Sequence, residues 1–193
     1  MSNHYSQKIF LVRHGQTAWS LSGKHTGRSN IPLTEAGKRN ATKLRPVLAH
    51  LNFEMALTSP LQRARETAHL AGFDEAIEDP DLMEWDYGQY EGITTAEIRK
   101  TAPNWTVFTQ PCPGGESGRS VGKRVDRVID RVKGCRGDAI LFAHGHVLRV
   151  LCARWLDMNP AQGMHFVLGT GNLNILGYEH ETPAIEVWNE HIH

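Results

Sequence analysis

The sequence predicts an α/β fold, a three-layer sandwich whose mainly parallel central sheet carries helices on both faces. Apart from Thr58, three short segments, 9–12, 55–58 and 139–143, are apolar throughout, which is typical of strands that are buried on both sides. A segment in which apolar residues recur at helical spacing follows each of them. This alternation of strand and helix is the pattern of a parallel sheet between two helical layers.

Length and composition indicate an ordinary globular protein. The chain has 193 residues, 40% of them apolar and 22% charged, which predicts one domain over 1–193 with an irregular excursion at about 85–118. The net charge is zero with histidine neutral, so a general nucleic-acid or membrane-surface binder, which needs a basic excess, is not expected. The three cysteines fit neither a disulfide framework nor a zinc pattern. With no apolar stretch near the roughly 18 residues of a membrane span, we expect a cytoplasmic protein.

The helix after the first strand contains a conflicting signal. Thr34 is a good N-cap, and apolar residues on one face continue to about Leu51. Pro46 falls inside this stretch, and a proline in a helix interior costs about 3 kcal/mol. We therefore expect a kink or a break there.

The next helix has clear signals at both ends. Ser59 is expected as the N-cap, with Pro60 in the first helical position and Gln62 completing a capping box. Gly72 is a suitable residue just after the end. The remaining expected elements are a short helix within 91–100, a Pro- and Gly-rich loop over 103–118, helices over 121–132 and 147–156, and one or two strands within 172–188.

Charged and polar side chains follow the three predicted strands. Arg13 and His14 come after the first, Ser59 with Arg63 after the second, and His144 after the third. In parallel sheets ligands bind outside the carboxyl ends of the strands. Because these ends share one edge, the side chains should meet in one cationic pocket.

Such a pocket suits a phosphate. Arginine presents a planar fork of donors that matches phosphate oxygens, and a helix N-terminus at Ser59 could add backbone N–H groups. A neutral His14 could attack phosphorus and form a phosphohistidine, provided that a backbone carbonyl within 15–20 holds its other nitrogen. The leaving group would need a proton, and Asp81, Glu84 and Asp86 are equal candidates on this reasoning.

Five motifs in the same order resemble those of the histidine phosphatase superfamily, the phosphoglycerate mutase-like proteins. The first is Leu-Val-Arg-His-Gly-Gln-Thr at 11–17. The others are Thr-Gly at 26–27 with Ile-Pro-Leu-Thr at 31–34 and Gly37, Ser-Pro-Leu-Gln-Arg-Ala at 59–64, Leu-Met-Glu at 82–84 with Tyr-Gly at 87–88 and Glu-Gly at 91–92, and Phe-Ala-His-Gly at 142–145. Together they cover residues 9 to about 156.

The resemblance implies a role for each matching residue. His14 would be the phosphorylated nucleophile, and Glu84 the proton donor, with no metal and no cofactor. The implied catalytic residues are His14, Glu84, His144, Arg13 and Arg63, and the implied substrate-binding residues are Arg13, Gln16, Ser20, Thr26, Gly27, Arg63, Glu84, Tyr87, Gly145 and His146. Ser20 departs from the asparagine of many members, and His146 stands where other residues are common. The other histidines, His25 among them, are expected to be ordinary polar residues.

The resemblance favours a phosphatase over a mutase. Mutases of the family hold a carboxylate with basic residues from an insertion after the acid motif, whereas 92–118 is short and has only Arg99 and Lys100 as cations. We expect hydrolysis of a small phosphorylated metabolite, a sugar phosphate above all, because several motifs are similar to the branch of sedoheptulose-bisphosphatase-like enzymes. The alternatives are a cofactor-dependent phosphoglycerate mutase-type phosphotransferase and a non-catalytic phosphate-binding member. A homo-oligomer is compatible with the sequence, and neither nucleic acid nor membrane is an expected partner.

Overall fold

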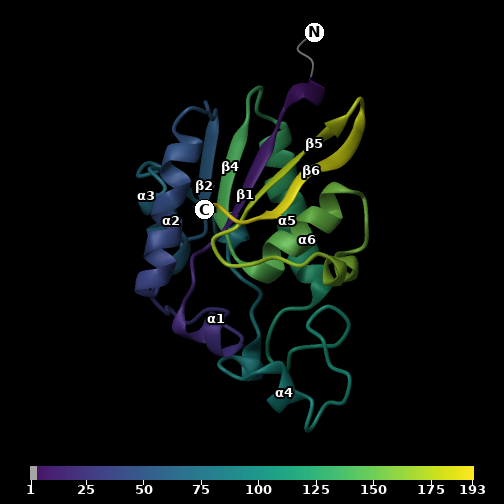
Figure 1. Ribbon diagram of the computed structural model, residues 1–193. Coiled ribbons are helices and arrows are strands. Elements are labelled where there is room, and N and C mark those ends of the chain that lie inside the picture. Colours follow the sequence, from purple (N-terminus) through teal and green to yellow (C-terminus); the bar gives the residue numbers. More distant parts are fainter. Residues whose placement is uncertain (1–3) are drawn as a thin grey trace.

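A computed structural model describes residues 4–193 and shows one six-stranded sheet at the centre of the molecule (Figure 1). The strands are β1 (Ile9–Arg13), β2 (Met55–Thr58), β3 (Ile77–Glu78), β4 (Ala139–Ala143), β5 (Leu173–Glu179) and β6 (Thr182–Glu190), arranged in the order β3-β2-β4-β1-β5-β6. The first four strands are parallel to one another, and β5 and β6 form an antiparallel hairpin beside β1. The predicted mainly parallel sheet is confirmed.

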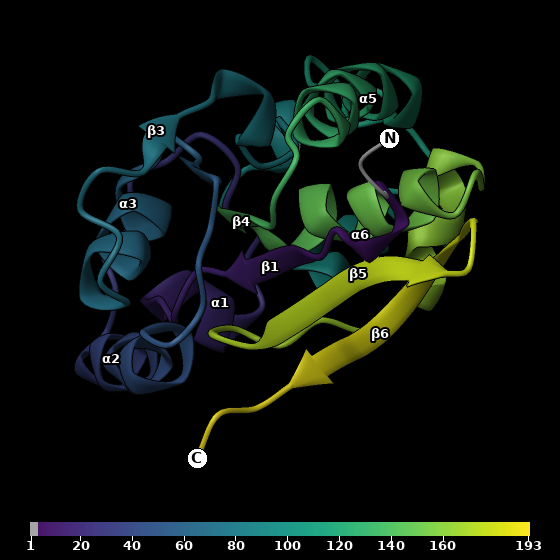
Figure 2. The same cartoon turned by 90° about the horizontal axis from the view of Figure 1, so that it is seen from above.

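Two pairs of helices cover the two faces of the sheet, as Figure 2 shows. Helices α2 (Glu35–Leu48) and α3 (Gln62–Leu70) lie on one face, and α5 (Gly118–Lys133) and α6 (Gly145–Trp155) lie on the other. Successive residues of β1 serve different layers. Phe10 and Val12 pack into the core beneath α2 and α3, while Ile9 and Leu11 belong to the core beneath α5 and α6. The predicted three-layer sandwich is therefore confirmed, with both strand faces buried.

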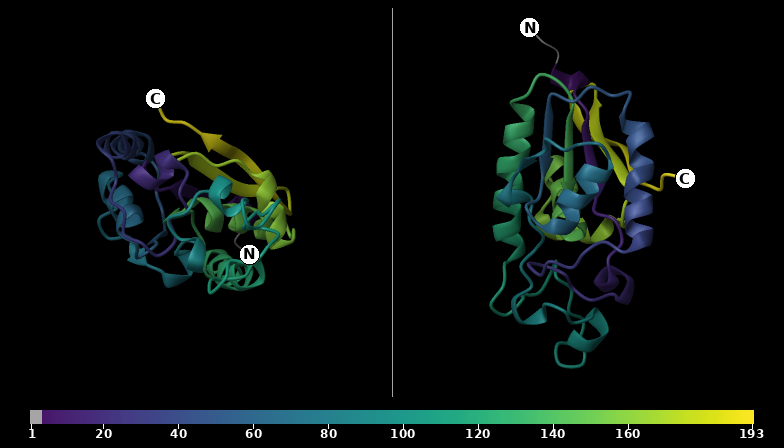
Figure 3. Two further views of the ribbon diagram at one scale, coloured as in Figure 1. Left: turned by 90° about the horizontal axis from the view of Figure 1, so that it is seen from below. Right: turned by 90° about the vertical axis from the view of Figure 1, so that its left-hand side faces the viewer.

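The shorter elements lie mostly at the carboxyl ends of the parallel strands. Helices α1 (Ala18–Ser22) and α4 (Thr95–Ile98) lie beyond this edge, and the loops around α4 extend furthest from the sheet (Figures 1 and 3). The 3₁₀ turns are η1 (His4–Ser6), η2 (Pro80–Leu82), η3 (Gly88–Tyr90) and η4 (Pro160–His165). No helix within residues 4–193 is long and apolar enough to cross a membrane.

Two local predictions were wrong, namely the break of the helix at Pro46 and the capping box at Ser59. Helix α2 continues through Pro46 as one element and ends at Leu48, because the proline falls in the last turn, where one lost backbone hydrogen bond interrupts little. The capping box at Ser59 does not form, since α3 begins at Gln62 and its N-cap, Leu61, makes no side-chain hydrogen bond. The Ser59 hydroxyl instead contacts a histidine of the site described below.

Candidate active site

Strand register places the two site histidines at the same level of the sheet. In the parallel pair β1 and β4, Arg13 lies opposite Ala143, so His14 and His144 are the next residues of neighbouring strands. The His14 N–H donates to the Ala143 carbonyl at 2.9 Å, and the two imidazole rings lie 5.1 Å apart between centroids. The predicted meeting of these residues at one sheet edge is what the structure shows.

His14 is held in the tautomer that a nucleophile needs. Its Nδ1 lies 2.7 Å from the Gly15 carbonyl oxygen, which can only accept, so Nδ1 carries the proton and Nε2 keeps its lone pair. The carbonyl lies within the stretch where we expected one. Burial of the ring, followed by the charges of Arg63 and Arg13, lowers the pKa of His14 well below its usual 6.5. The buried imidazole is therefore neutral at physiological pH.

His144 is held in a complementary way by Ser59. The Ser59 hydroxyl accepts from the Leu61 N–H at 3.3 Å and lies 2.7 Å from Nε2 of His144. Among residues 4–193 this hydroxyl has no other acceptor within hydrogen-bond distance, so it donates to Nε2. In the neutral ring the proton is then on Nδ1, which is buried and has no partner in the described part of the chain. This Nδ1–H is a free donor beside His14.

The two predicted arginines have different surroundings, since Arg63 is fully buried and Arg13 is partly exposed. Arg13 donates from one terminal nitrogen to the Leu168 carbonyl, and Arg63 donates to three carbonyls of the loop after α1. Within residues 4–193, the Nε atoms of both arginines are buried without a partner. An anion bound beside His14 would satisfy donors of this kind. The carbonyls that Arg63 contacts belong to Thr26, Gly27 and Ser29.

The structure selects Glu84 from the three acidic candidates. The buried Glu84 carboxylate lines the same cavity as Arg13 and His14. Asp81 instead forms an ion pair with Arg127 on the surface of α5, and Asp86 accepts from the backbone N–H of Gly88. Only Glu84 is thus within the site.

Glu84 is anchored at the start of α6. Its Oε2 accepts from the N–H of His146 at 3.0 Å, and its Oε1 accepts from the N–H groups of Val147 at 3.0 Å and Trp85 at 2.9 Å. A helix N-terminus presents such unsatisfied N–H groups and favours negative charge. The helix whose start serves the site is therefore α6, whereas the sequence suggested the helix after Ser59.

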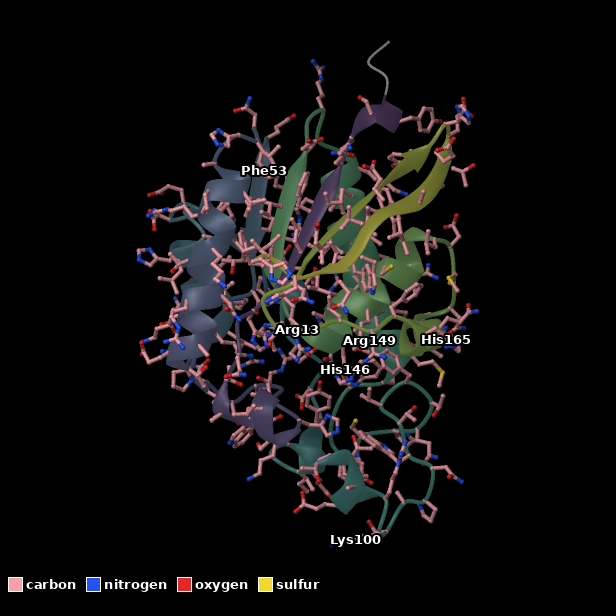
Figure 4. All side chains as sticks on the ribbon, in the orientation of Figure 1. Arg13, Phe53, Lys100, His146, Arg149 and His165 are labelled. Atoms are coloured by element: carbon pink, nitrogen blue, oxygen red, sulfur yellow. The ribbon has the colours of Figure 1, made fainter. Side chains whose placement is uncertain are left out.

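A cavity of about 210 Å³ lies beside these groups. Arg13, His146 and Arg149 all line it, and Figure 4 shows them close together at the lower end of the sheet. Among residues 4–193 no group of three or more His, Cys, Asp or Glu side chains is arranged to hold a metal ion. The lining residues are Arg13, His14, Ser20, Gly23, Lys24, His25, Thr26, Glu84, Tyr87, Gly145, His146, Arg149 and Leu168.

Four of the predicted site residues do not line this cavity, and they are Gln16, Gly27, Arg63 and His144. Gln16 accepts from the Thr34 hydroxyl at 2.9 Å and so secures the start of α2, while the Gly27 N–H donates to Glu91. Arg63 binds the carbonyls of the loop after α1, and its charge acts on His14. Gln16 and Gly27 thus shape the site from outside the cavity, whereas the buried Arg63 and His144 act directly on His14.

Tyr87 and His146 form one wall of the cavity. The Tyr87 hydroxyl lies 2.5 Å from Nδ1 of His146. Burial raises the pKa of Tyr87 well above 10, and burial together with Arg149 and His25 lowers the pKa of His146 well below 6.5. A neutral phenol and a neutral imidazole therefore share one hydrogen bond in this wall.

Sequence reasoning missed two notable residues of the wall. His25 was expected to be an ordinary polar residue, but its ring packs 4.8 Å from Tyr87 and 6.0 Å from His146, and burial lowers its pKa to about 4. Its position directly before the Thr-Gly motif at 26–27 was the one available signal. Arg149 lies three residues after His146 on α6, a spacing that places both on one helix face and could have revealed it.

A second cavity of about 210 Å³ adjoins the first and shares His25, His146 and Arg149 with it. Its only other charged lining residue is Arg99. Much of the remaining cavity wall consists of aromatic and apolar side chains, namely Trp105, Val107, Phe108 and Met164. The two cavities together offer space for a ligand larger than a phosphate.

Comparison with known proteins agrees with this geometry. A family model described as the histidine phosphatase superfamily (branch 1) matches residues 9–191. An acid phosphatase of Mycobacterium tuberculosis is 37% identical over 186 residues, which cover 94% of this chain and 92% of the relative. The sedoheptulose 1,7-bisphosphatase of Saccharomyces cerevisiae is 34% identical over 188 residues, covering 78% of this chain and 68% of the relative.

Solved structures show the same relationship. The structure of a protein from an open reading frame of Mycobacterium tuberculosis is 36% identical and superposes with a TM-score of 0.93, covering 97% of this chain and 99% of the other. The mycobacterial glucosyl-3-phosphoglycerate phosphatase superposes with a TM-score of 0.83 at 26% identity, covering 95% and 99% of the two chains. The chain thus has a phosphoglycerate mutase-like fold and belongs to the histidine phosphatase superfamily.

Proposed function

We propose that this histidine phosphatase hydrolyses phosphomonoesters of small metabolites, sugar phosphates above all, through a phosphohistidine on His14. The observation that carries the proposal is the state of the His14 ring. It is buried and neutral, its Nδ1 is bound to a carbonyl oxygen, and its Nε2 lone pair is free. Arginine side chains and the Nδ1–H of His144 surround it with donors for phosphate oxygens.

The reaction has two steps. In the first, Nε2 of His14 forms a bond to phosphorus while the bond to the ester oxygen breaks, and Glu84 protonates the departing alkoxide. In the second, Glu84 takes a proton from water, whose oxygen displaces His14 and releases inorganic phosphate. Arg13, Arg63 and His144 would stabilise the negative charge on the phosphoryl oxygens in both steps.

The substrate class follows from the site's size and from the relatives. A pocket for one phosphate adjoins a second cavity that could hold the organic part of the ester. Relatives at more than 30% identity include sedoheptulose 1,7-bisphosphatase and an adenosylcobalamin/alpha-ribazole phosphatase of Salmonella typhimurium, both of which are named for phosphorylated sugars or sugar-containing metabolites. We place the reaction in the cytoplasm.

The first experiment replaces the nucleophile. The variant His14→Ala should lose hydrolysis of p-nitrophenyl phosphate, while His50→Ala, at an exposed histidine, should retain it. Rapid quenching of the wild-type enzyme with labelled substrate should trap phosphate on His14. Wild-type turnover by His14→Ala would refute the mechanism, and the absence of any adduct in a protein that binds phosphate would favour a binding module.

The second experiment identifies the substrate. A panel of phosphorylated metabolites should be ranked by kcat/KM for phosphate release, with a phosphoglycerate included. Release of inorganic phosphate from a sugar phosphate is the expected outcome. Isomerisation of the phosphoglycerate without phosphate release would instead identify a mutase.

A further inference from the structure

The segment that carries Glu84 has little regular structure of its own. Residues 83–87 lie between the 3₁₀ turns η2 and η3, outside the sheet and the long helices. The backbone of this segment must nevertheless be fixed if the carboxylate is to meet a leaving group beside His14. Two charged side chains from elsewhere in the chain, Arg124 on α5 and Glu116 just before it, bind the segment on both sides of Glu84.

Arg124 holds the residues before Glu84. Its guanidinium is buried at 6% exposure and donates from one terminal nitrogen to the carbonyls of Asp81 and Met83, at 2.6 Å each. The other nitrogens form a two-pronged contact with Glu116, from Nε to Oε1 at 3.0 Å and from the second terminal nitrogen to Oε2 at 3.1 Å. One side chain thus joins the acid segment to Glu116.

Glu116 holds the residues after Glu84. Its backbone N–H donates to the Asp86 carbonyl, and its Oε2 accepts from the Asp86 N–H, both at 2.9 Å. Its carbonyl accepts from the indole N–H of Trp85 at 2.9 Å. The backbone on each side of Glu84 is therefore bound to the same ion pair, in which Arg124 is buried and Glu116 is partly exposed.

A contribution to stability alone does not account well for this pair. Removing charges from water carries a desolvation cost that often cancels their attraction, so an ion pair with one buried partner is weak evidence of stabilisation. What it does provide is defined geometry, because a guanidinium fork fixes several acceptors at once. Here those acceptors flank Glu84.

We propose that Arg124 and Glu116 are positioning residues that hold Glu84 at the distance from which it protonates the leaving group. The inference rests on the proposed function, in which Glu84 is the proton donor. A displacement of a catalytic group by about 1 Å can cost on the order of 100-fold in rate. The loss should be greatest for substrates that need the proton most.

The test compares good and poor leaving groups. We would measure kcat/KM for p-nitrophenyl phosphate, whose leaving group needs little protonation, and for an alkyl phosphate, in the wild type and in the variants Arg124→Lys, Glu116→Gln and Glu84→Gln. Lysine keeps the charge but cannot bind four acceptors, and glutamine cannot accept from the Asp86 N–H through its amide nitrogen. Each of the first two variants should lose about tenfold more activity on the alkyl phosphate than on the aryl phosphate.

A matched control lies one helical turn further along α5. Arg127 also binds the acid segment, but only through the side chain of Asp81, and it is exposed. The variant Arg127→Lys should behave as the wild type on both substrates. Thermal unfolding of every variant gives the folded fraction by which each rate is corrected. If Arg124→Lys does not fold, Glu116→Gln, which is the smaller change, tests the proposal by itself.

A double mutant separates positioning from general damage. If Arg124 acts through Glu84, adding Arg124→Lys to Glu84→Gln should cause no further selective loss on the alkyl phosphate. Equal losses on both substrates in Arg124→Lys and Glu116→Gln, together with a selective loss in Glu84→Gln, would overturn this inference alone. Equal losses in Glu84→Gln itself would overturn the assignment of the proton donor, and with it the positioning role.

Discussion

The two sides of the catalytic cavity are held in place by different means. On one side, His14 and His144 follow neighbouring parallel strands, and the backbone register of the sheet sets their spacing. On the other side, Glu84 lies on an irregular segment that is fixed by the α6 N-terminus and by Arg124 and Glu116. Register tolerates change in individual side chains, whereas a segment held by side chains depends on each of them. The two sides should therefore respond differently to mutation.

Of the variants that test this comparison, those at Arg63 on α3, close to the sheet side, should have the largest effect. Replacing Arg63 by Gln removes a buried charge next to the phosphate pocket and the bonds to three loop carbonyls, so kcat/KM for p-nitrophenyl phosphate should fall by on the order of 100-fold to 1000-fold. The matched control is Arg65→Gln on the same helix, since Arg65 is exposed and its guanidinium pairs with Glu78 on the surface. A loss of the same size in both variants would contradict a specific role for Arg63.

A smaller loss is expected at Ser59, which holds a side chain without altering the sheet register. In Ser59→Ala, Nε2 of His144 loses its hydrogen-bond donor, and the proton is no longer confined to Nδ1. We expect kcat/KM to fall by about tenfold, the equivalent of one good hydrogen bond in the transition state. Ser59→Thr keeps the hydroxyl and should recover part of the activity. An unchanged rate in Ser59→Ala would show that the tautomer of His144 does not matter.

The neutral histidines predict a loss of stability in acid. The pKa of His25 falls from 6.5 to about 4 on folding because the ring is buried, so between these values the unfolded chain binds the proton and the folded chain does not. The stability that neutral His25 contributes is complete above pH 6.5 and declines as the pH falls towards 4. His14, His144 and His146 are shifted in the same direction and should add to the decline.

Urea unfolding at pH 7.5 and 5.5 measures this effect. Protonation of His25 in the unfolded chain alone should cost about 1 kcal/mol of unfolding free energy over that interval, and the other three histidines should add to the decline. His25→Gln, which cannot take up the proton, should show a decline that is smaller by that amount. The same pH dependence in the variant and the wild type would mean that His25 is not buried in its neutral form.

The smallest effect is expected at Arg99, which lines the second cavity but not the first. Arg99→Gln removes one of the two arginines of that cavity. KM should rise by a few-fold for a substrate with a second anionic group, with little change in kcat, because the lost contact would bind ground state and transition state alike. Lys100→Gln is the control, since Lys100 is exposed and lies at the tip of the excursion (Figure 4). An equal rise in both variants would indicate a general effect of charge.

The sheet side of the site could be predicted because it depends on local signals. Apolar strands that end at Arg13, Ser59 and His144 are visible in the sequence, and a parallel sheet must bring such ends to one edge. Even the carbonyl that holds His14 was expected within the following loop, and it belongs to Gly15. Capping at Ser59 was predicted wrongly because its hydroxyl bonds to His144, which is distant in sequence.

Residues alone thus determined the order of strands and helices, the three-layer architecture and the group of charged side chains at one edge. Among Asp81, Glu84 and Asp86, by contrast, local chemistry gave no preference, and the choice of Glu84 came from the family resemblance and then from the cavity. Only the tertiary structure brought His25 into the wall and tied the acid segment to α5 and α6. The end of a buried strand can be predicted from the residues of that segment, because its apolar run stops there. The path of an irregular loop depends on contacts with residues that are distant in the sequence.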